Sequence, residues 1–148
     1  MLHIPKQKKY DALRAPQPNH TWHMDVSHFK TIDNVKFYIY TVVDNFSRKI
    51  VSHYVSRKLS ADIRVQSLRQ AIINEFDVEL KNQQLDLIVD GGSENNNHTV
   101  AKFIRNCEVS IKKKIALKDV TFSNSIIEGT YRIMKTYYFR KKEIYASN

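Results

Sequence analysis

The sequence of 148 residues has few of the residues that cross-link or interrupt a chain: one cysteine, three prolines and three glycines. The lone Cys107 excludes an internal disulfide and a zinc site built from cysteines, which fits a reducing compartment. No apolar run approaches the roughly 18 residues of a membrane span, and the first residues do not resemble a signal peptide. We therefore expect a cytoplasmic protein of about one domain, with no need of a disulfide to fold.

Positive charge is plentiful and unevenly distributed, with a formal net charge of +9. Residues 1–20 hold four basic and one acidic side chain, residues 21–99 hold nine and ten, and residues 100–148 hold eleven and four. A near-neutral middle followed by a basic final third is typical of carboxylates gathered near side chains that bind phosphate. The plain alternative is a solvated basic surface without a partner.

The pattern of apolar residues predicts an α/β domain, with a mixed five-stranded sheet flanked by helices. Residues 1–20 hold all the prolines and form an extended, poorly packed basic lead-in, and residues 143–148 form a tail. Between them we predict three antiparallel strands, then helix, strand, helix, strand and helix, with the fourth strand parallel to the first. The predicted strands are residues 21–30, two strands around the turn Asp44–Ser47, Leu85–Val89 and Val109–Ile115; the predicted helices are Ser60–Phe76, Thr99–Asn106 and Ser123–Lys142.

The stretch LIVDGGSENN, residues 87–96, ends an apolar strand on a carboxylate, Asp90, followed by two glycines. One interpretation is a surface turn, since Asp and Gly are common turn residues. The other is a strand that delivers a carboxylate to a metal ion, with glycines that let a ligand approach the backbone. By itself the stretch favours the surface turn.

Two more acidic residues favour the metal interpretation. Asp25 lies within the first predicted strand, Asp90 ends the fourth, and Glu128 lies early on the last helix. Because the first and fourth strands are expected to be neighbours, the three carboxylates could converge where that helix passes the sheet. Without a cation, carboxylates so placed would repel and raise one another's pKa. Ligation by oxygen alone suits Mg²⁺ or Mn²⁺, and two such ions can activate an attacking oxygen and stabilise a leaving oxygen on phosphorus.

Four stretches of the sequence form a recognisable series: Trp22–Asp25, Val43–Val51, Asp90–Glu94, and Asn124–Glu128 followed by Lys135. In the same order they resemble a tryptophan-x-x-aspartate strand, an aspartate-x-x-serine-arginine hairpin, a strand-end aspartate with a glycine loop, and a helix that bears a glutamate. These are motifs of the retroviral integrases and insertion-sequence transposases, the Asp-Asp-Glu recombinases. Together they span roughly residues 20–142. Gly91 stands where asparagine is usual and Ser125 where many members have alanine, but no presumed ligand is missing.

The resemblance implies a ribonuclease-H-like catalytic core, residues 21–142, that cleaves DNA and transfers strands by phosphoryl transfer. Asp25, Asp90 and Glu128 would be its catalytic metal ligands: Asp25 would bridge two Mg²⁺ or Mn²⁺ ions, Asp90 would bind one and Glu128 the other. Water would attack at an element end, and a DNA 3′-hydroxyl would then attack target DNA. The implied partners are element ends, target DNA and further copies of the chain in a homodimer or larger homo-oligomer, in the bacterial cytosol or nucleoid.

Basic and polar residues near this set are candidate DNA contacts. Lys135 lies two helical turns beyond Glu128, hence on the same face, where it would meet a phosphate near the scissile bond or remain a solvated lysine. Asn124 would touch DNA or cap the last helix. Lys112, Lys113 and Lys114 would contact phosphates without sequence preference.

Other residues and functions compete with these predictions. Asp44 is the rival of Asp25, but it lies in a turn sequence, so we interpret it as structural. His23 either supports Asp25 or is packed or solvated, and Glu94 is a loop acid that faces solvent or supplements the carboxylates. One alternative function is a nuclease of the same fold that hydrolyses DNA and never joins ends. Another is a non-catalytic remnant of a transposase that only binds DNA.

Overall fold

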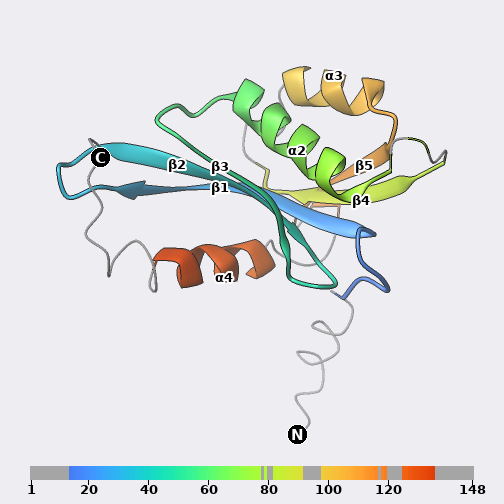
Figure 1. The fold of residues 1–148 in the computed structure, drawn as a ribbon, viewed down its shortest axis with the longest axis horizontal. Helices are drawn as coiled ribbons and strands as arrows, with labels where there is room; N and C mark the ends of the chain where they lie inside the picture. The colour runs from blue at the N-terminus through green and yellow to red at the C-terminus, as the bar shows by residue number, and fades with distance from the viewer. Residues whose placement is uncertain are drawn as a thin grey trace, which may run out of the picture.

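A computed structural model of the chain describes residues 14–77, 79, 82–91, 98–116, 118–119 and 125–135. Within these residues one five-stranded sheet has the order β3-β2-β1-β4-β5 (Figure 1). β1 is antiparallel to β2, β2 is antiparallel to β3, and β4 is parallel to both β1 and β5. The elements are β1 Thr21–Lys30, β2 Lys36–Asp44, β3 Ile50–Ser56, α2 Ala61–Glu75, β4 Gln84–Val89, α3 His98–Asn106, β5 Ser110–Ile115 and α4 Ser125–Met134. This order and sheet confirm the predicted fold class.

Helices cover both faces of the sheet, with α2 and α3 on one face and α4 on the other (Figure 1). Alternate residues of β1 serve the two faces, as a period of two requires. Trp22 and Met24 belong to the larger core under α2 and α3, whereas Phe29 packs with Ile127 and Tyr131 of α4. The even-numbered residues at the start of β1 therefore form the core, and the odd-numbered ones, including Asp25, face α4.

Two polar contacts seat α2 on the sheet. Ser60 is the N-cap predicted from the sequence: its side chain accepts a hydrogen bond from the Asp62 amide at 3.1 Å. The Ser60 amide in turn donates to the Tyr40 hydroxyl at 2.8 Å. Further along α2, the hydroxyl oxygens of Ser67 on the helix and Ser52 on β3 lie 3.3 Å apart in the buried interface. These contacts fix how far α2 is advanced along β2 and β3.

The turn between β2 and β3 confirms the structural interpretation of Asp44. The buried Asp44 carboxylate accepts hydrogen bonds from the amide and hydroxyl of Ser47 and from the Asn19 amide, at 2.6–2.9 Å. Beside it, the Ala15 amide donates to Asn45 Oδ1 at 2.6 Å, and Ala15 is buried. The lead-in is therefore attached to the sheet at Ala15 and Asn19, whereas residues 16–18 are exposed. Residues 1–13 lie outside the described residues.

The ends of the elements fall close to the predicted positions. The described part of the last helix runs from Ser125 to Met134, so the remainder of the predicted helix to Lys142 lies outside the described residues, as does Asn124. Among the described helices, none has the length and apolar character needed to cross a membrane.

Candidate functional site

The sheet brings Asp25 and Asp90 together. β1 and β4 pair in parallel, and their last registered pair is Met24 with Val89. Asp25 and Asp90 are the next residue on each strand, so the register sets them side by side. Both follow core residues that face α2, so both side chains point to the opposite face, where α4 lies. The predicted neighbourhood of these two carboxylates is therefore present in the fold.

The electrostatics of Asp25 reflect this contact. Burial, the negative charge of Asp90 and a hydrogen bond with the Asp90 side chain raise the pKa of Asp25 from 3.8 to about 7. The Val26 amide and the positive charge of Arg64 act in the opposite direction. Two carboxyl groups that share a hydrogen bond hold a proton between them. A cation at this position would replace that proton and relieve the repulsion.

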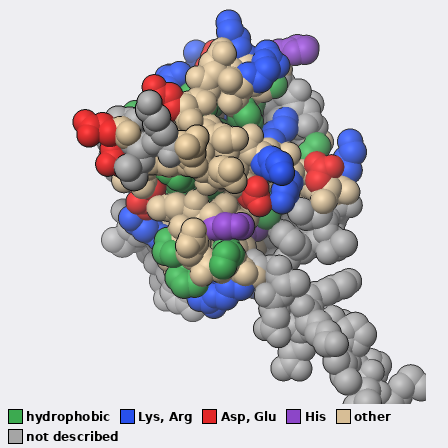
Figure 2. Space-filling model, turned by 90° about the vertical axis from the view of Figure 1, so that its right-hand side faces the viewer, with side chains coloured by type: hydrophobic (Ala, Val, Ile, Leu, Met, Phe, Trp, Pro, Cys, Tyr) green, Lys and Arg blue, Asp and Glu red, His purple; other side chains and the backbone are tan. Residues whose placement is uncertain are grey.

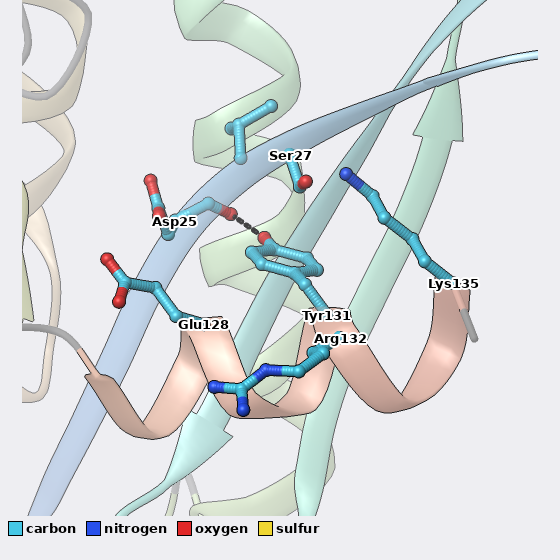
Figure 3. Close-up of a pocket in the computed structure, with 7 residues that line it drawn as sticks. Asp25, Ser27, Glu128, Tyr131, Arg132 and Lys135 are labelled. Atoms are coloured by element: carbon cyan, nitrogen blue, oxygen red, sulfur yellow. Dashed lines mark hydrogen bonds between the residues drawn. The ribbon is translucent and has the colours of Figure 1, made fainter. Parts of the chain in front are cut away.

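Helix α4 brings a third carboxylate, Glu128, to a cavity that Asp25 also lines. A cavity of about 340 Å³ lies between β1 and α4, and Asp25 and Glu128 both line it. The carboxyl groups of these two residues lie at the same end of the cavity, and Lys135 lies at the far end of the helix segment (Figure 3). The whole lining consists of Asp25, Val26, Ser27, Glu128, Tyr131, Arg132 and Lys135. Glu128 and Lys135 thus share a face of α4.

In the described part of the chain, the carboxylates of Asp25, Asp90 and Glu128 do not lie close enough together to bind one metal ion. Within the part of the chain that the structure describes, no three Asp, Glu, His or Cys side chains lie close enough together to hold a metal ion. Asp25 and Asp90 are in contact, while Glu128 faces the same cavity from α4. The donor set is nevertheless one of carboxylate oxygens, which fits a hard divalent cation such as Mg²⁺.

Tyr131 fastens α4 to the sheet beside the carboxylates. Its hydroxyl lies 2.5 Å from the Asp25 carbonyl oxygen and 3.1 Å from that of Ile39, and it donates to them. Burial raises the pKa of the Tyr131 phenol far above its ordinary value, so the group stays neutral. Tyr131 lies one turn after Glu128 and so sets the position of Glu128 relative to Asp25. The sequence analysis did not identify this role of Tyr131, although its spacing of one helical turn from Glu128 was a usable signal.

The three lysines of β5 lie away from this cavity. Lys114 Nζ is 3.0 Å from Asp86 Oδ2, and Lys112 and Lys114 line a second hollow with Asp86 at the start of β4 and β5. Lys113 is half-buried, and burial lowers its pKa. On the side of the molecule in Figure 2, basic side chains lie among acidic and polar ones rather than in one continuous patch. The structure therefore does not bring these lysines to Asp25, and Asn124 lies outside the described residues.

His23 is packed rather than part of the cavity. It has no exposed surface, and its Nε2 lies 2.9 Å from Asn45 Nδ2. Of the alternatives that the sequence left open for His23, burial against the β2–β3 turn is the one observed. Glu94 lies outside the described residues.

One protein family model matches the chain. The model of the integrase core domain family matches residues 15–114, which include Asp25 and Asp90. The chain belongs to the integrase core domain family. The matched segment of this integrase core ends before α4, so Glu128 and Lys135 are placed by the fold rather than by the family match. No curated protein matched the chain.

Solved integrase structures share the fold of this integrase core. A chain of the simian T-cell lymphotropic virus intasome, in complex with PP2A regulatory subunit B56 gamma, is 23% identical with a TM-score of 0.67, over 87% of this chain and 44% of that one. The HTLV-2 integrase catalytic core with magnesium, in its trimeric form, is 24% identical with a TM-score of 0.63, over 82% and 70%. The BIV integrase catalytic core is 20% identical with a TM-score of 0.58, over 79% and 67%. The integrase core thus spans less than half of the intasome chain, and the likeness confirms the ribonuclease-H-like fold.

Proposed function

We propose that this integrase core is a Mg²⁺-dependent polynucleotidyl transferase that cleaves DNA and joins a DNA 3′-hydroxyl to target DNA. The observation that carries the proposal is the Asp25–Asp90 pair, in contact where the parallel ladder of β1 and β4 ends. Glu128 faces the same cavity and supplies the third carboxylate. The HTLV-2 catalytic core, which has the same fold, was solved in complex with magnesium.

The three carboxylates have distinct proposed roles. Asp25 would contact two divalent ions, Asp90 one of them and Glu128 the other. The side chain of Glu128 is exposed, so it can change rotamer toward Asp25 without loss of core packing. Bound there, Mg²⁺ or Mn²⁺ would activate the attacking oxygen and stabilise the leaving oxygen on phosphorus.

Residues of α4 would hold the DNA. Arg132 and Lys135 line the cavity with Glu128 and present positive charge to a phosphate that enters it. Asp25 must lose its proton before it can bind a cation, and its pKa of about 7 means that this loss is largely complete by pH 8. Metal loading should therefore increase between pH 6 and pH 8.

Label transfer to plasmid DNA tests this function. A fluorescent duplex with a random-sequence recessed 3′-hydroxyl is incubated with supercoiled plasmid, Mg²⁺ or Mn²⁺ and the chain. We expect covalent label on the plasmid with the wild type and none with Asp90→Asn. Asp86→Asn is the matched control, because it removes a carboxylate of β4 that lies in the second hollow beside Lys114, away from Asp25. Nicking without label transfer would support the nuclease instead, and a chain inactive with both metals would support the DNA-binding remnant.

Assembly and location are part of the same proposal. Joining two element ends requires two active sites, so we propose a homodimer or larger homo-oligomer, acting on DNA in the bacterial cytosol or nucleoid. Ile73 of α2 and Val55 of β3 are 59% and 49% exposed, and such apolar surface is available for contact between copies. Structures of the HTLV-2 catalytic core have been solved in a dimeric form and in a trimeric form. Sedimentation equilibrium that shows only monomer at high protein concentration would contradict this part.

A further inference from the structure

Basic side chains gather at one end of the sheet, where β1 ends, β2 begins and β3 ends. Lys30 is the last residue of β1, Lys36 is the first of β2, and Arg57 and Lys58 follow β3. The registers of β1 with β2 and of β2 with β3 set these strand ends side by side. All four side chains are exposed. We call Lys30, Lys36, Arg57 and Lys58 the basic rim.

The charge of the basic rim is not neutralised by nearby carboxylates. In the part of the chain that the structure describes, none of the four side chains forms an ion pair with an acidic residue. Two of them lie over aromatic rings instead: Lys36 Nζ is 5.3 Å from the centre of the Tyr38 ring, and Arg57 Cζ is 5.9 Å from the centre of the Phe37 ring. An aromatic ring holds a cation in place without cancelling its charge. The basic rim is therefore available to an anion.

Two of the charges repel each other. Lys30 and Lys36 are directly opposite, as the last registered pair of β1 and β2. Like charges at directly opposed positions destabilise a sheet. Asp33 lies in the turn between them, where its carboxylate accepts a hydrogen bond from the Thr31 hydroxyl at 2.5 Å. A bound anion would offset the repulsion, whereas the plain alternative is a solvated rim whose charges discourage pairing with other strands.

The basic rim continues the cavity that Asp25 lines. Lys135 lies at the end of that cavity away from the carboxyl groups (Figure 3). The β1–β2 hairpin projects past one end of α4 (Figure 1). That end is the one that carries Lys135, because Phe29 of β1 and Met134 pack against the same core cluster. Phe29 in turn stacks on Phe37, with 5.6 Å between the ring centres. The cavity and the hairpin thus form one continuous surface.

His28 lies where the two parts of this surface meet. Desolvation and three ammonium groups lower the pKa of His28; the groups are those of Lys36, Lys135 and Lys30. These lysines come from β2, α4 and β1, so positive charge runs from the cavity to the hairpin without a break at His28.

The strand itself gives the distance from the carboxylates to the basic rim. Lys30 is five residues beyond Asp25 on β1. At about 3.3 Å per residue, this is roughly 17 Å. Successive base pairs of duplex DNA are about 3.4 Å apart along the helix axis, so the span equals about five base pairs.

We propose that the basic rim binds the phosphate backbone of duplex DNA about five base pairs from the bond that reacts in the cavity. The stated distance rests on the proposed function, because it requires that Asp25 and its partners act on DNA. Binding of DNA by the basic rim requires no catalysis, so it is measured separately and without metal.

Three double variants separate the charge of the basic rim from charge elsewhere. Lys30→Gln with Lys36→Gln removes two rim charges; its melting temperature should not fall, because the two lysines repel each other. Lys30→Arg with Lys36→Arg keeps the charges. Lys102→Gln with Arg105→Gln is the matched control, because it removes two exposed charges of α3, on the face of the sheet opposite α4 (Figure 1).

The first measurement is the affinity for a fluorescent duplex of random sequence, in EDTA, as the salt concentration is varied. The slope of the logarithm of the binding constant against the logarithm of salt concentration should become shallower by about two in the glutamine variant of the rim, since each lost phosphate contact removes about 0.9. The arginine variant and the α3 control should keep the wild-type slope. An unchanged slope in the glutamine variant would overturn the proposal, and so would an equal change in the α3 control.

The second measurement is strand transfer to plasmid from stem-loop donors with about four or about sixteen base pairs, closed by the same non-nucleotide linker. If the basic rim holds the donor, the glutamine variant should transfer the long donor less efficiently and the short donor as well as the wild type does. If the basic rim holds the target, transfer of both donors should fall, and binding to plasmid should show the shallower salt slope. Either result supports the proposal, and unchanged transfer of both donors would overturn the stated position. A wild type that binds DNA and transfers no strand would refute the proposed function, while the salt slope in EDTA still decides whether the basic rim binds DNA.

Discussion

Asparagine in place of Asp25 should stabilise the metal-free chain at neutral and alkaline pH while it removes the proposed metal ligand. The reason is the position of Asp25, half-buried and in contact with Asp90. Its ionised form is disfavoured there by burial and by the second negative charge. Asparagine has nearly the same shape and no charge to bury, and it can still form a hydrogen bond with Asp90.

The size of the effect follows from the two pKa values of Asp25. The ordinary value is 3.8, and the folded value is about 7. Between these pH values the folded state keeps a proton that the unfolded state has lost, so stability falls as pH rises through this window and stays lower above it. At about 1.4 kcal/mol per pKa unit, the ionised carboxylate costs the folded chain about 4 kcal/mol at pH 8. For a domain of this size that corresponds to about 10 °C in melting temperature.

The assay is urea unfolding in EDTA, followed by circular dichroism from pH 4 to pH 8.5. We expect Asp25→Asn and the wild type to be about equally stable near pH 4, and the variant to be more stable by a margin that grows up to pH 7. Asp62→Asn controls for the loss of an exposed negative charge. Added Mg²⁺ should raise the stability of the wild type at pH 8 and leave Asp25→Asn unchanged. A margin that does not grow with pH, or a variant less stable than the wild type at pH 8, would refute the reasoning.

Three further substitutions test separate parts of the site. Tyr131→Phe removes the hydroxyl that binds the Asp25 carbonyl, and it should lower the free energy of unfolding in urea by about 1–2 kcal/mol. Ile127→Val is the control, because it costs a similar amount through packing alone. Tyr131→Phe should slow strand transfer more than this control does. Equal losses of activity would exclude a positioning role. Asn45→Ala removes the side chain that bonds the buried Ala15 amide and the His23 ring, and it should cost about 2–4 kcal/mol in urea unfolding. A cost below about 1 kcal/mol would contradict this. Lys135→Ala should leave the free energy of unfolding within about 0.5 kcal/mol of the wild type. The slope of the logarithm of the DNA-binding constant against the logarithm of salt concentration should become shallower by about one. An unchanged slope would mean that Lys135 meets no phosphate.

Most of the fold could be predicted because local signals and sheet topology agree. The alternation of Trp22 and Met24 with Asp25 marks a strand between two covered faces, and Ser60 marks the start of α2. The turns were harder, since the chain has few glycines. Residues with positive φ in the described turns include Asn19 at 60° and Arg48 at 65°. Arginine gives no sequence signal for that conformation, so such turns are recognised only from structure.

The site was predictable to the extent that it depends on strand order. A parallel neighbour for β1 puts Asp90 beside Asp25 whatever the details of the helices. The contact of Tyr131 with the Asp25 carbonyl could not be identified in this way, because it depends on how α4 is seated on the sheet. That seating is set by contacts distant in sequence, between the Tyr131 hydroxyl and the carbonyl oxygens of Asp25 and Ile39.

The two halves of the candidate site differ in how firmly they are held. Asp25 and Asp90 belong to paired strands of one sheet, so their contact is fixed by backbone hydrogen bonds on both strands. Glu128 belongs to α4, which is seated on the sheet through the buried Ile127 and the Tyr131 hydroxyl. A small displacement of α4, or a rotamer change of Glu128, alters the third ligand without disturbing the first two. Binding of a cation to the pair should therefore precede engagement of Glu128, and loss of the Tyr131 hydroxyl should affect the second event more than the first.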